Sequence, residues 1–397
     1  MRVPDGFRWG VATAAYQIEG AAAEDGRGPS VWDTFSHTPG RVRDGHTGDV
    51  ACDHYHRWPE DVALMRDLGV DSYRFSIAWP RVQPAGSGPV NAKGLDFYDR
   101  LVDGLLAAGI APAATLYHWD LPQPLEDTGG WLERDTAYRF AEFSYLAAER
   151  LADRVDMWIT LNEPVVVTAY GYAFGVHAPG RALMLDALPT AHHQLLGHGL
   201  AVHALRSKNA RKVGLTNHYS PAWAASPDDQ PAADAFDAFM NRLFTDPVLT
   251  GRYPDIMDGA AYVRSEDLSV IAAPIDFLGV NYYQPTRLAT PSEVPLPFDM
   301  VDVTEYPTPG MGWPIVPDAF LSLLRTLHSR YDLPPIYITE NGCSFPDEIG
   351  PDGVVDDSAR IDFLDAHIKA MQTAIDEGID IRGYYTWSLL DNFEWSE

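Results

Sequence analysis

Two glutamates, Glu163 and Glu340, are the residues of this sequence best suited to carry out chemistry. Glu340 follows an apolar, β-prone run at residues 336–339 and is followed at once by an Asn-Gly turn signal. Glu163 likewise lies just past a β-prone run, at residues 157–161. A carboxyl group at the tip of an apolar strand is typical of a catalytic group in an α/β barrel, although a solvated turn residue gives the same local pattern. Paired carboxyl groups suit glycoside hydrolysis, in which one protonates the departing oxygen and the other attacks or stabilises the sugar carbon.

The segments that would position these glutamates alternate between strand and helix patterns. Strands are predicted at residues 7–14, 72–77, 111–117, 157–161, 212–217, 277–283, 336–340 and 381–386. Helices are predicted at residues 58–68, 96–108, 134–152, 188–207, 234–243, 318–331 and 358–377, and residues 284–316 are predicted as loop. No composition break would serve as a linker. The alternation therefore favours an α/β fold, a (β/α)8 TIM barrel in a single catalytic domain over residues 1–397, although this length could also hold two to three smaller domains.

The ends of the predicted strands are rich in polar and aromatic side chains. At or just past these ends lie Gln17, Arg74, His118, Asn162, Glu163, Tyr283, Glu340 and Trp387. In a parallel barrel the C-terminal strand ends share one rim, where barrel enzymes hold their active sites. Each residue alone could be the polar edge of a turn, but the set together predicts a site.

Different surroundings would give the two glutamates different roles. Arg74 and Tyr283 would hold Glu340 ionised through charge and hydrogen bonding. Glu163 has no cationic neighbour in the sequence. We therefore predict Glu340 as the nucleophile and Glu163 as the acid.

The other rim residues suit a sugar. Donors and acceptors for ring hydroxyls are offered by Gln17, His118, Asn162 and Glu394. Flat apolar faces for the C–H surface of a sugar are offered by Trp119, Trp387 and Trp395, and Trp313, in the long loop after the sixth strand, is predicted to line the entrance. Aromatic residues in barrel loops more often serve packing, and this alternative applies to each tryptophan.

The bulk composition narrows the class of protein. The net charge is -27, from 56 acidic and 29 basic residues, which argues against nucleic acid or an anionic membrane as a partner. The hydrophobic fraction of 46% indicates a folded core. No apolar run is long enough to span a bilayer and no signal-peptide pattern is seen, so a cytoplasmic enzyme is expected. Whether copies of the chain form a homo-oligomer stays open.

Cysteine, histidine and glycine patterns predict no metal and no other cofactor. Cys52 and Cys343 lie far apart in the sequence and are predicted to be free thiols. The pair His192-His193 is not accompanied by the carboxylate or cysteine ligands that would complete a metal site. The glycines at 171 and 175 lack the lysine and the strand-to-helix setting of a phosphate loop, so a nucleotide cofactor is not expected.

Taken as a whole, the chain resembles the glycoside hydrolase family 1 β-glucosidases from Phe7 to its last residue. The resemblance rests on the motifs at residues 7–20 (FRWGVATAAYQIEG), 51–57 (ACDHYHR), 73–81 (YRFSIAWPR), 117–122 (YHWDLP), 160–164 (TLNEP), 281–283 (NYY), 338–342 (ITENG) and 387–395 (WSLLDNFEW). It implies a retaining β-glycosidase that removes the non-reducing terminal β-D-glucosyl residue of small β-glucosides and cello-oligosaccharides through a covalent glycosyl-enzyme intermediate.

The same resemblance implies roles for individual residues. Glu163 would be the acid/base and Glu340 the nucleophile, with their carboxyl groups about 5–5.5 Å apart as in retaining enzymes. The supporting residues would be Arg74, Asn281 and Tyr283. The glucose unit would be bound by Gln17, His118, Asn162, Glu394 and Trp395, with Trp387 beneath it and Trp313 toward the leaving group.

Two other functions remain as alternatives. One is a catalytically impaired carbohydrate-binding barrel, and the other is a 6-phospho-β-glycosidase. The carboxylate of Glu394 would repel a sugar phosphate, which disfavours the second. Members of the family normally continue past the motif at residues 387–395 with a final helix on the outside of the barrel. We therefore expect the sequence, which ends at Glu397, to be truncated relative to the family and to lack this C-terminal helix.

Overall fold

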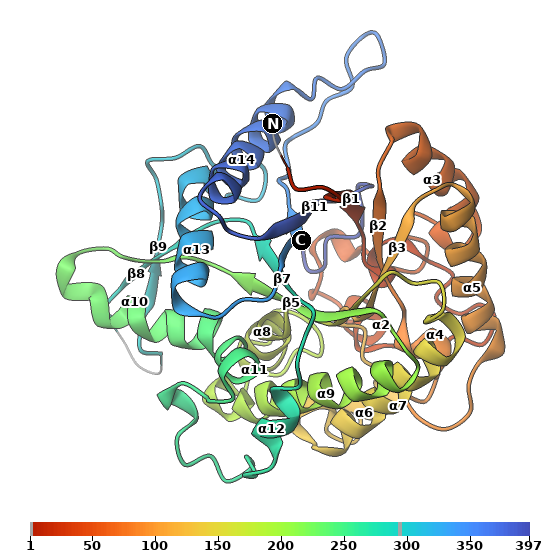
Figure 1. Ribbon diagram of the computed structural model, residues 1–397, viewed down its shortest axis with the longest axis horizontal. Helices are drawn as coiled ribbons and strands as arrows, with labels where there is room; N and C mark the ends of the chain where they lie inside the picture. The colour runs from red at the N-terminus through yellow and green to blue at the C-terminus, as the bar shows by residue number, and fades with distance from the viewer. Residues whose placement is uncertain (1–2, 293–295) are drawn as a thin grey trace.

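The structure is a computed structural model that describes residues 3–292 and 296–397. Its centre is a closed barrel of parallel strands in the order β1-β11-β10-β7-β5-β4-β3-β2 (Figure 1). The barrel strands are β1 Arg8–Ala12, β2 Ser72–Ser76, β3 Ala111–Tyr117, β4 Met157–Asn162, β5 Lys212–Tyr219, β7 Phe277–Tyr282, β10 Ile336–Asn341 and β11 Ile381–Trp387. The predicted barrel fold is confirmed, and each predicted strand overlaps an observed one.

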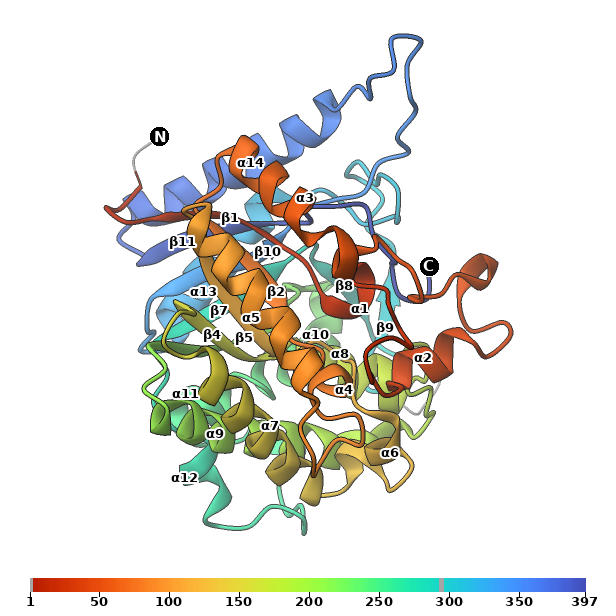
Figure 2. The ribbon, with the colours of Figure 1, turned by 90° about the vertical axis from the view of Figure 1, so that its right-hand side faces the viewer.

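Helices lie between successive strands and cover the outside of the barrel (Figures 1 and 2). The longer ones are α3 His54–Leu68, α5 Ala92–Ala107, α7 Asp135–Leu151, α9 Leu188–Ser207, α13 Pro317–Arg330 and α14 Ser358–Asp376. The shorter ones are α1 Ala15–Ile18, α2 Val31–Ser36, α4 Trp79–Val82, α6 Gln123–Glu126, α8 Pro164–Val166, α10 Gln230–Phe236, α11 Asp246–Thr250 and α12 Asp267–Ile271. Among the described residues, no helix is both long enough and apolar enough to cross a bilayer.

The outer helices follow the apolar spacing that predicted them. In α5 the side chains of Phe97, Leu101 and Leu105, four residues apart, are all buried, so that they form one face toward the barrel. Burial of each such side chain contributes about 1.5–3 kcal/mol. α3 ends at Leu68, and Gly69 caps it with a φ of 74°, a left-handed conformation that is common after helix ends and that glycine adopts without strain.

The region predicted as loop at residues 284–316 contains two strands, so that part of the prediction is wrong. β8 Thr286–Ala289 pairs in parallel with β6 Ala222–Ala224 and antiparallel with β9 Asp299–Val301, forming a small sheet outside the barrel. These strands are three or four residues long, and β6 is far from β8 in the sequence. Because the pairing partner is distant, the local pattern of prolines and threonines does not reveal it. The helix predicted at residues 234–243 also differs, since α10 ends at Phe236 and continues as a π-helical turn.

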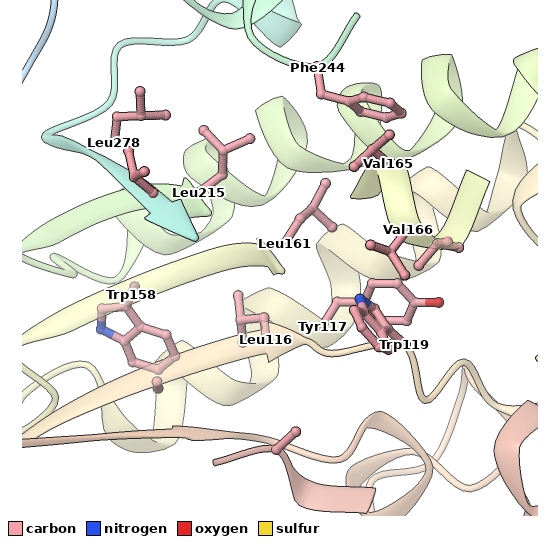
Figure 3. Close-up of a cluster of buried hydrophobic side chains, with 14 of the residues drawn as sticks. Leu116, Tyr117, Trp119, Trp158, Leu161, Val165, Val166, Leu215, Phe244 and Leu278 are labelled. Carbon is pink, nitrogen blue, oxygen red and sulfur yellow. The ribbon is translucent and has the colours of Figure 1, made fainter. Parts of the chain in front are cut away.

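Apolar side chains fill both faces of the strands. A cluster inside the barrel consists of Ala12, Ala113, Met157, Ile159, Phe277, Tyr337 and Tyr385. A larger layer packs between strands and helices, and Figure 3 shows the part formed by Leu116, Leu161, Leu215 and Leu278. With both faces packed, the strand ends are fixed in place and can hold polar side chains in defined positions.

Candidate active site

Glu340 lies near the end of β10, at the mouth of the barrel. In a regular strand consecutive side chains point to opposite faces. Thr339 and Glu340 nevertheless both bond to polar groups of the barrel mouth. The pairing of β10 with β7 shifts register between Ile338 and Glu340, and an irregularity of this kind re-aims side chains. An apolar strand thereby delivers a carboxyl group to the mouth.

Two donors hold the carboxyl group of Glu340, one on each oxygen. Arg74 Nη1 donates to Oε1 over 2.7 Å, and the Tyr283 hydroxyl donates to Oε2 over 2.6 Å. The residues in register with Arg74 are Ala12 on β1 and Ala113 on β3, whose small side chains leave room for the buried guanidinium. The contacts that the sequence led us to expect around Glu340 are therefore present.

Glu163 follows β4 directly and adopts a left-handed conformation, with φ 45° and ψ 59°. This conformation costs a residue other than glycine about 1–3 kcal/mol, and residues strained in this way cluster at functional sites. Pro164 then begins α8, because its fixed φ suits the first position of a helix. The buried side chains of Val165 and Val166 pack beside Leu161 and anchor the turn (Figure 3).

Asn281, near the end of β7, connects the two glutamates. Its Nδ2 donates to Glu163 Oε1 over 2.8 Å and to Asn162 Oδ1 over 3.2 Å. Its Oδ1 accepts from Thr339 Oγ1 over 2.7 Å, so the amide orientation is fixed. Asn162 Oδ1 also accepts from Arg74 Nη2, the guanidinium that holds the other glutamate. One network of hydrogen bonds thus positions both carboxyl groups.

Burial disfavours the charged form of the carboxyl groups in the barrel mouth. It is the largest influence on the pKa of Glu340 and raises that pKa to about 7; the Arg74 guanidinium opposes the rise and the charge of Glu163 adds to it. Burial likewise raises the pKa of Glu394 to about 7, assisted by the charge of Glu340. From the sequence we expect only contacts that favour the ionised form of Glu340. The structure shows in addition that burial opposes its ionisation. Near neutral pH the mouth therefore holds less negative charge than its carboxyl groups would carry in water.

Gln17, on α1, is held by the segment that follows β11. Its Nε2 donates to Asn392 Oδ1 over 2.8 Å, to the Phe393 carbonyl over 2.9 Å and to Glu394 Oε2 over 3.4 Å. Its buried Oε1 has no hydrogen-bonding partner among the described residues. The N-terminal and C-terminal motifs of the sequence therefore meet here, and an acceptor is left free for a ligand hydroxyl.

His118, just past β3, offers a donor. Burial holds the pKa of His118 well below its usual value, with the Arg74 charge acting in the same direction, so the ring is neutral. Asn162 Nδ2 lies 3.0 Å from Nε2 and donates to it, because Asn162 Oδ1 is occupied by other donors. The ring proton is then on the buried Nδ1, which has no partner within the part of the chain that the structure describes.

The predicted tryptophans fall into two groups. Trp119 and Trp395 are buried, with ring centroids 4.5 Å apart, and Trp119 Nε1 donates to the Asn162 carbonyl over 2.9 Å. Trp387 and Trp313 keep exposed surface. Trp387 stacks at 5.7 Å from the His118 ring, and Trp313 lies 5.3 Å from Tyr283 beside a small surface hollow. Trp387 and Trp313 are thus the rings with a face available to a ligand.

One residue at the site was missed from the sequence. His218, on β5, has its Nδ1 3.4 Å from Glu163 Oε1. The sequence pattern predicts that the fifth strand ends at Asn217, whereas β5 runs two residues further, to Tyr219. The position of a histidine one residue past a predicted strand end was the available signal. Among the described residues, no group of three or more His, Cys, Asp or Glu side chains forms a metal site.

The comparisons with known proteins agree with this geometry. A sequence profile of glycosyl hydrolase family 1 matches residues 1–397. The chain belongs to glycosyl hydrolase family 1. Within this family it is 53% identical to thermostable beta-glucosidase B of Thermobispora bispora, over 99% of this chain and 84% of that protein. It is 48% identical to a bifunctional beta-D-glucosidase/beta-D-fucosidase of Bifidobacterium breve, over 100% of this chain and 91% of that protein.

Solved structures from glycosyl hydrolase family 1 have the same barrel. Beta-glucosidase from Thermotoga maritima in complex with deoxynojirimycin matches with a TM-score of 0.95 at 46% identity, covering 100% of this chain and 91% of that chain. Identity at this level together with the full overlap shows that the likeness extends well beyond the fold.

Proposed function

We propose that this family 1 protein is a retaining β-glucosidase. Its reaction is hydrolysis of the non-reducing terminal β-D-glucosyl residue of small β-glucosides and cello-oligosaccharides, through a covalent glycosyl-enzyme intermediate. The observation that carries the proposal is that two buried carboxyl groups lie in one barrel mouth and are contacted by different kinds of group. Glu340 contacts a guanidinium, whereas Glu163 contacts an amide and an imidazole. The names of its relatives support a glucoside as substrate.

The contacts support different roles for the two glutamates. With a single proton between them, the negative charge is best placed on Glu340, 2.7 Å from Arg74, and the proton on Glu163. Glu340 attacks the anomeric carbon while Glu163 gives its proton to the departing oxygen, and the C–O bond breaks with its electron pair on the leaving group. Glu163 then takes a proton from water, which attacks the glycosyl-enzyme and releases glucose with retained configuration.

The glucose unit would lie among the side chains with free polar atoms and free faces. Gln17 Oε1 and His118 Nδ1 each lack a protein partner and would bond to ring hydroxyls. Glu394 and Asn162 add further polar atoms, and Trp387 offers a face for the C–H surface. Trp313, beside Tyr283, would contact the leaving group. Trp119 and Trp395 would act mainly by supporting this pocket through their packing.

Azide rescue tests the assignment of both glutamates. Glu340→Gly should abolish hydrolysis of an aryl β-glucoside, and azide should restore turnover by attacking from the vacated side, giving the α-glucosyl azide. Glu163→Gly should still react with a substrate whose leaving group needs no protonation, and azide should then attack the glycosyl-enzyme to give the β-glucosyl azide.

The configuration of the azide products, measured by NMR, shows which glutamate is the nucleophile and which is the acid. Interchanged products would reverse the two roles. Full activity in Glu340→Gly, or saturable binding of glucosides by the wild-type protein without turnover, would exclude the proposed mechanism; the second result would point to a carbohydrate-binding barrel.

A further inference from the structure

His218 lies at the same level of the barrel as the catalytic groups. On β5 it stands in register with Asn281 on β7, and Asn281 stands in register with Glu340 on β10. Its ring stacks against Tyr283 at 6.3 Å with an interplanar angle of 20°. The side chain retains 18% of its exposed area, so the ring borders the open mouth and is not part of the packed core. Among the described residues, the titratable groups in contact with it are Glu163 and Tyr283.

The hydrogen bonds at Glu163 distinguish its two oxygens. Oε1 accepts from Asn281 Nδ2 over 2.8 Å and lies 3.4 Å from His218 Nδ1. Oε2 accepts no hydrogen bond from any residue in the described ranges. The Asn281 amide cannot turn over, because its oxygen is occupied by the Thr339 hydroxyl. The protein therefore directs its polar contacts to one oxygen and leaves the other for the substrate.

We infer that His218 is a positioning residue that, together with Asn281, sets which oxygen of Glu163 carries the transferable proton. With a proton on Nδ1, His218 donates to Oε1 beside Asn281, so that Oε1 is the carbonyl-type acceptor and the proton of Glu163 resides on Oε2. The 3.4 Å between His218 Nδ1 and Glu163 Oε1 is longer than a strong hydrogen bond, and catalytic contacts of this kind tighten when substrate binds. This inference rests on the proposed function, in which Glu163 is the acid.

The Oε2–H bond of Glu163 breaks and its proton joins the glycosidic oxygen, which also receives the electron pair of the breaking C–O bond. Glu340 supplies the electron pair of the new bond to the anomeric carbon. Without the His218 donor, only Asn281 Nδ2 donates to Oε1, so a larger share of molecules carries the proton on Oε1 and fewer present it to the leaving group.

The dependence of rate on the leaving group isolates this effect. Leaving groups that depart as stable anions, such as 2,4-dinitrophenolate, need no proton, whereas the sugar alkoxide released from cellobiose needs one. A defect in proton delivery therefore slows cellobiose selectively. A general distortion of the mouth would slow both substrates alike, since both need Glu340 and the glucose contacts.

Two substitutions separate the donor from the ring. His218→Phe keeps an aromatic ring beside Tyr283 and removes the donor. His218→Asn removes the ring and retains an N–H group near the place of Nδ1. His203→Asn, at an exposed position of α9, is the matched control. Thermal unfolding of each variant shows whether it is folded.

We expect His218→Phe to lower kcat/KM for cellobiose about 10-fold or more while changing that for 2,4-dinitrophenyl β-glucoside by less than about 3-fold. His218→Asn should recover most of the loss on cellobiose, and the control should match the wild type. Equal loss on both substrates, or better activity in His218→Phe than in His218→Asn, would overturn the positioning role and leave packing. Failure of the wild type to hydrolyse either substrate would instead refute the proposed function itself.

Discussion

Arg74 Nη1 contacts two groups of β10 at once, donating to Glu340 Oε1 over 2.7 Å and to the Thr339 carbonyl over 3.0 Å. The Glu340 side chain and the strand that carries it are therefore fixed by the same nitrogen. Because both residues are buried, the pair can be broken only at a cost: removal of one partner from a buried ion pair typically costs about 3–5 kcal/mol.

Arg74→Met should raise the pKa of Glu340 further, since burial would then act without its main opposing charge. The acidic limb of the kcat/KM profile should move to higher pH by about one unit or more. We also expect a large loss of stability, measured by urea unfolding. Arg139→Met, which breaks an exposed ion pair on α7, should cost less than about 1 kcal/mol. An unchanged pH profile in a folded Arg74→Met protein would contradict the role of this arginine.

Gly279→Ala should disturb the site from within the barrel. An added Cβ would lie 2.2 Å from Thr216 Oγ1 and 2.9 Å from Thr339 Oγ1. Thr339 orients Asn281, so we expect a loss of about 1–3 kcal/mol in stability together with a lower kcat. Adding Thr216→Ala, which removes the nearer clash, should restore part of both. If the double variant merely sums the two single effects, the clash is not the cause.

Asp120→Asn should flatten the dependence of stability on pH. Burial raises the pKa of Asp120 from its ordinary 3.8 to about 8, and neither carboxyl oxygen has a hydrogen-bonding partner in another described residue. The folded state thus holds the proton more tightly than the unfolded chain. This contribution is fully present below about pH 4 and is lost as the pH rises through about 8.

Between about pH 6 and pH 9, the wild type should therefore lose about 2 kcal/mol more unfolding free energy than Asp120→Asn. Denaturant unfolding at several pH values measures this difference. Asp258→Asn, at an exposed position, should follow the wild type. Parallel pH curves for the wild type and Asp120→Asn would show that Asp120 is charged in the folded protein.

His118→Phe should weaken binding of a glucose-shaped inhibitor such as deoxynojirimycin, the compound bound in the Thermotoga maritima structure. The substitution removes the free Nδ1–H and leaves Asn162 Nδ2 without its acceptor. One hydrogen bond of this kind corresponds to about a 10-fold rise in the inhibition constant. The inhibitor-induced rise in Tm should shrink accordingly, whereas His328→Phe on the exposed side of α13 should retain it.

A 6-phosphorylated aryl glucoside should be a poor substrate, at less than about 1% of the rate of its unphosphorylated counterpart. Glu163, Glu340 and Glu394 lie close enough to influence one another, and the Arg74 guanidinium is already bound to Glu340. Glu394→Ser should narrow the difference in rate between the two substrates. Comparable rates in the wild-type enzyme would favour a 6-phospho-β-glycosidase.

The strand ends could be predicted from the sequence because each is a local signal. A run of apolar, β-prone residues that stops at Glu340 or at Asn162 needs no knowledge of the rest of the chain, and barrel closure then brings these ends together. Long amphipathic helices such as α5 were predictable for the same reason.

Features that depend on two distant segments were not predictable. β8 is a strand only because β6 lies beside it, and neither segment has the length to reveal this. His218 belongs to the site because the turn after β4 places Glu163 next to it. The rise in the pKa of Glu340 comes from burial, which no motif records.

The small sheet beside the barrel has a consequence for engineering. β5 and β7 are neighbours in the barrel, and the segments that leave them, β6 and β8, remain paired outside it, with Ser220 Oγ donating to the Gln284 carbonyl over 3.0 Å at the junction. The two loops are thus one physical unit, with His218 and Tyr283 at its base. A chimaera that exchanges only one of these loops with a homologue would leave unpaired strand edges, so the two segments must be exchanged together to keep the small sheet intact.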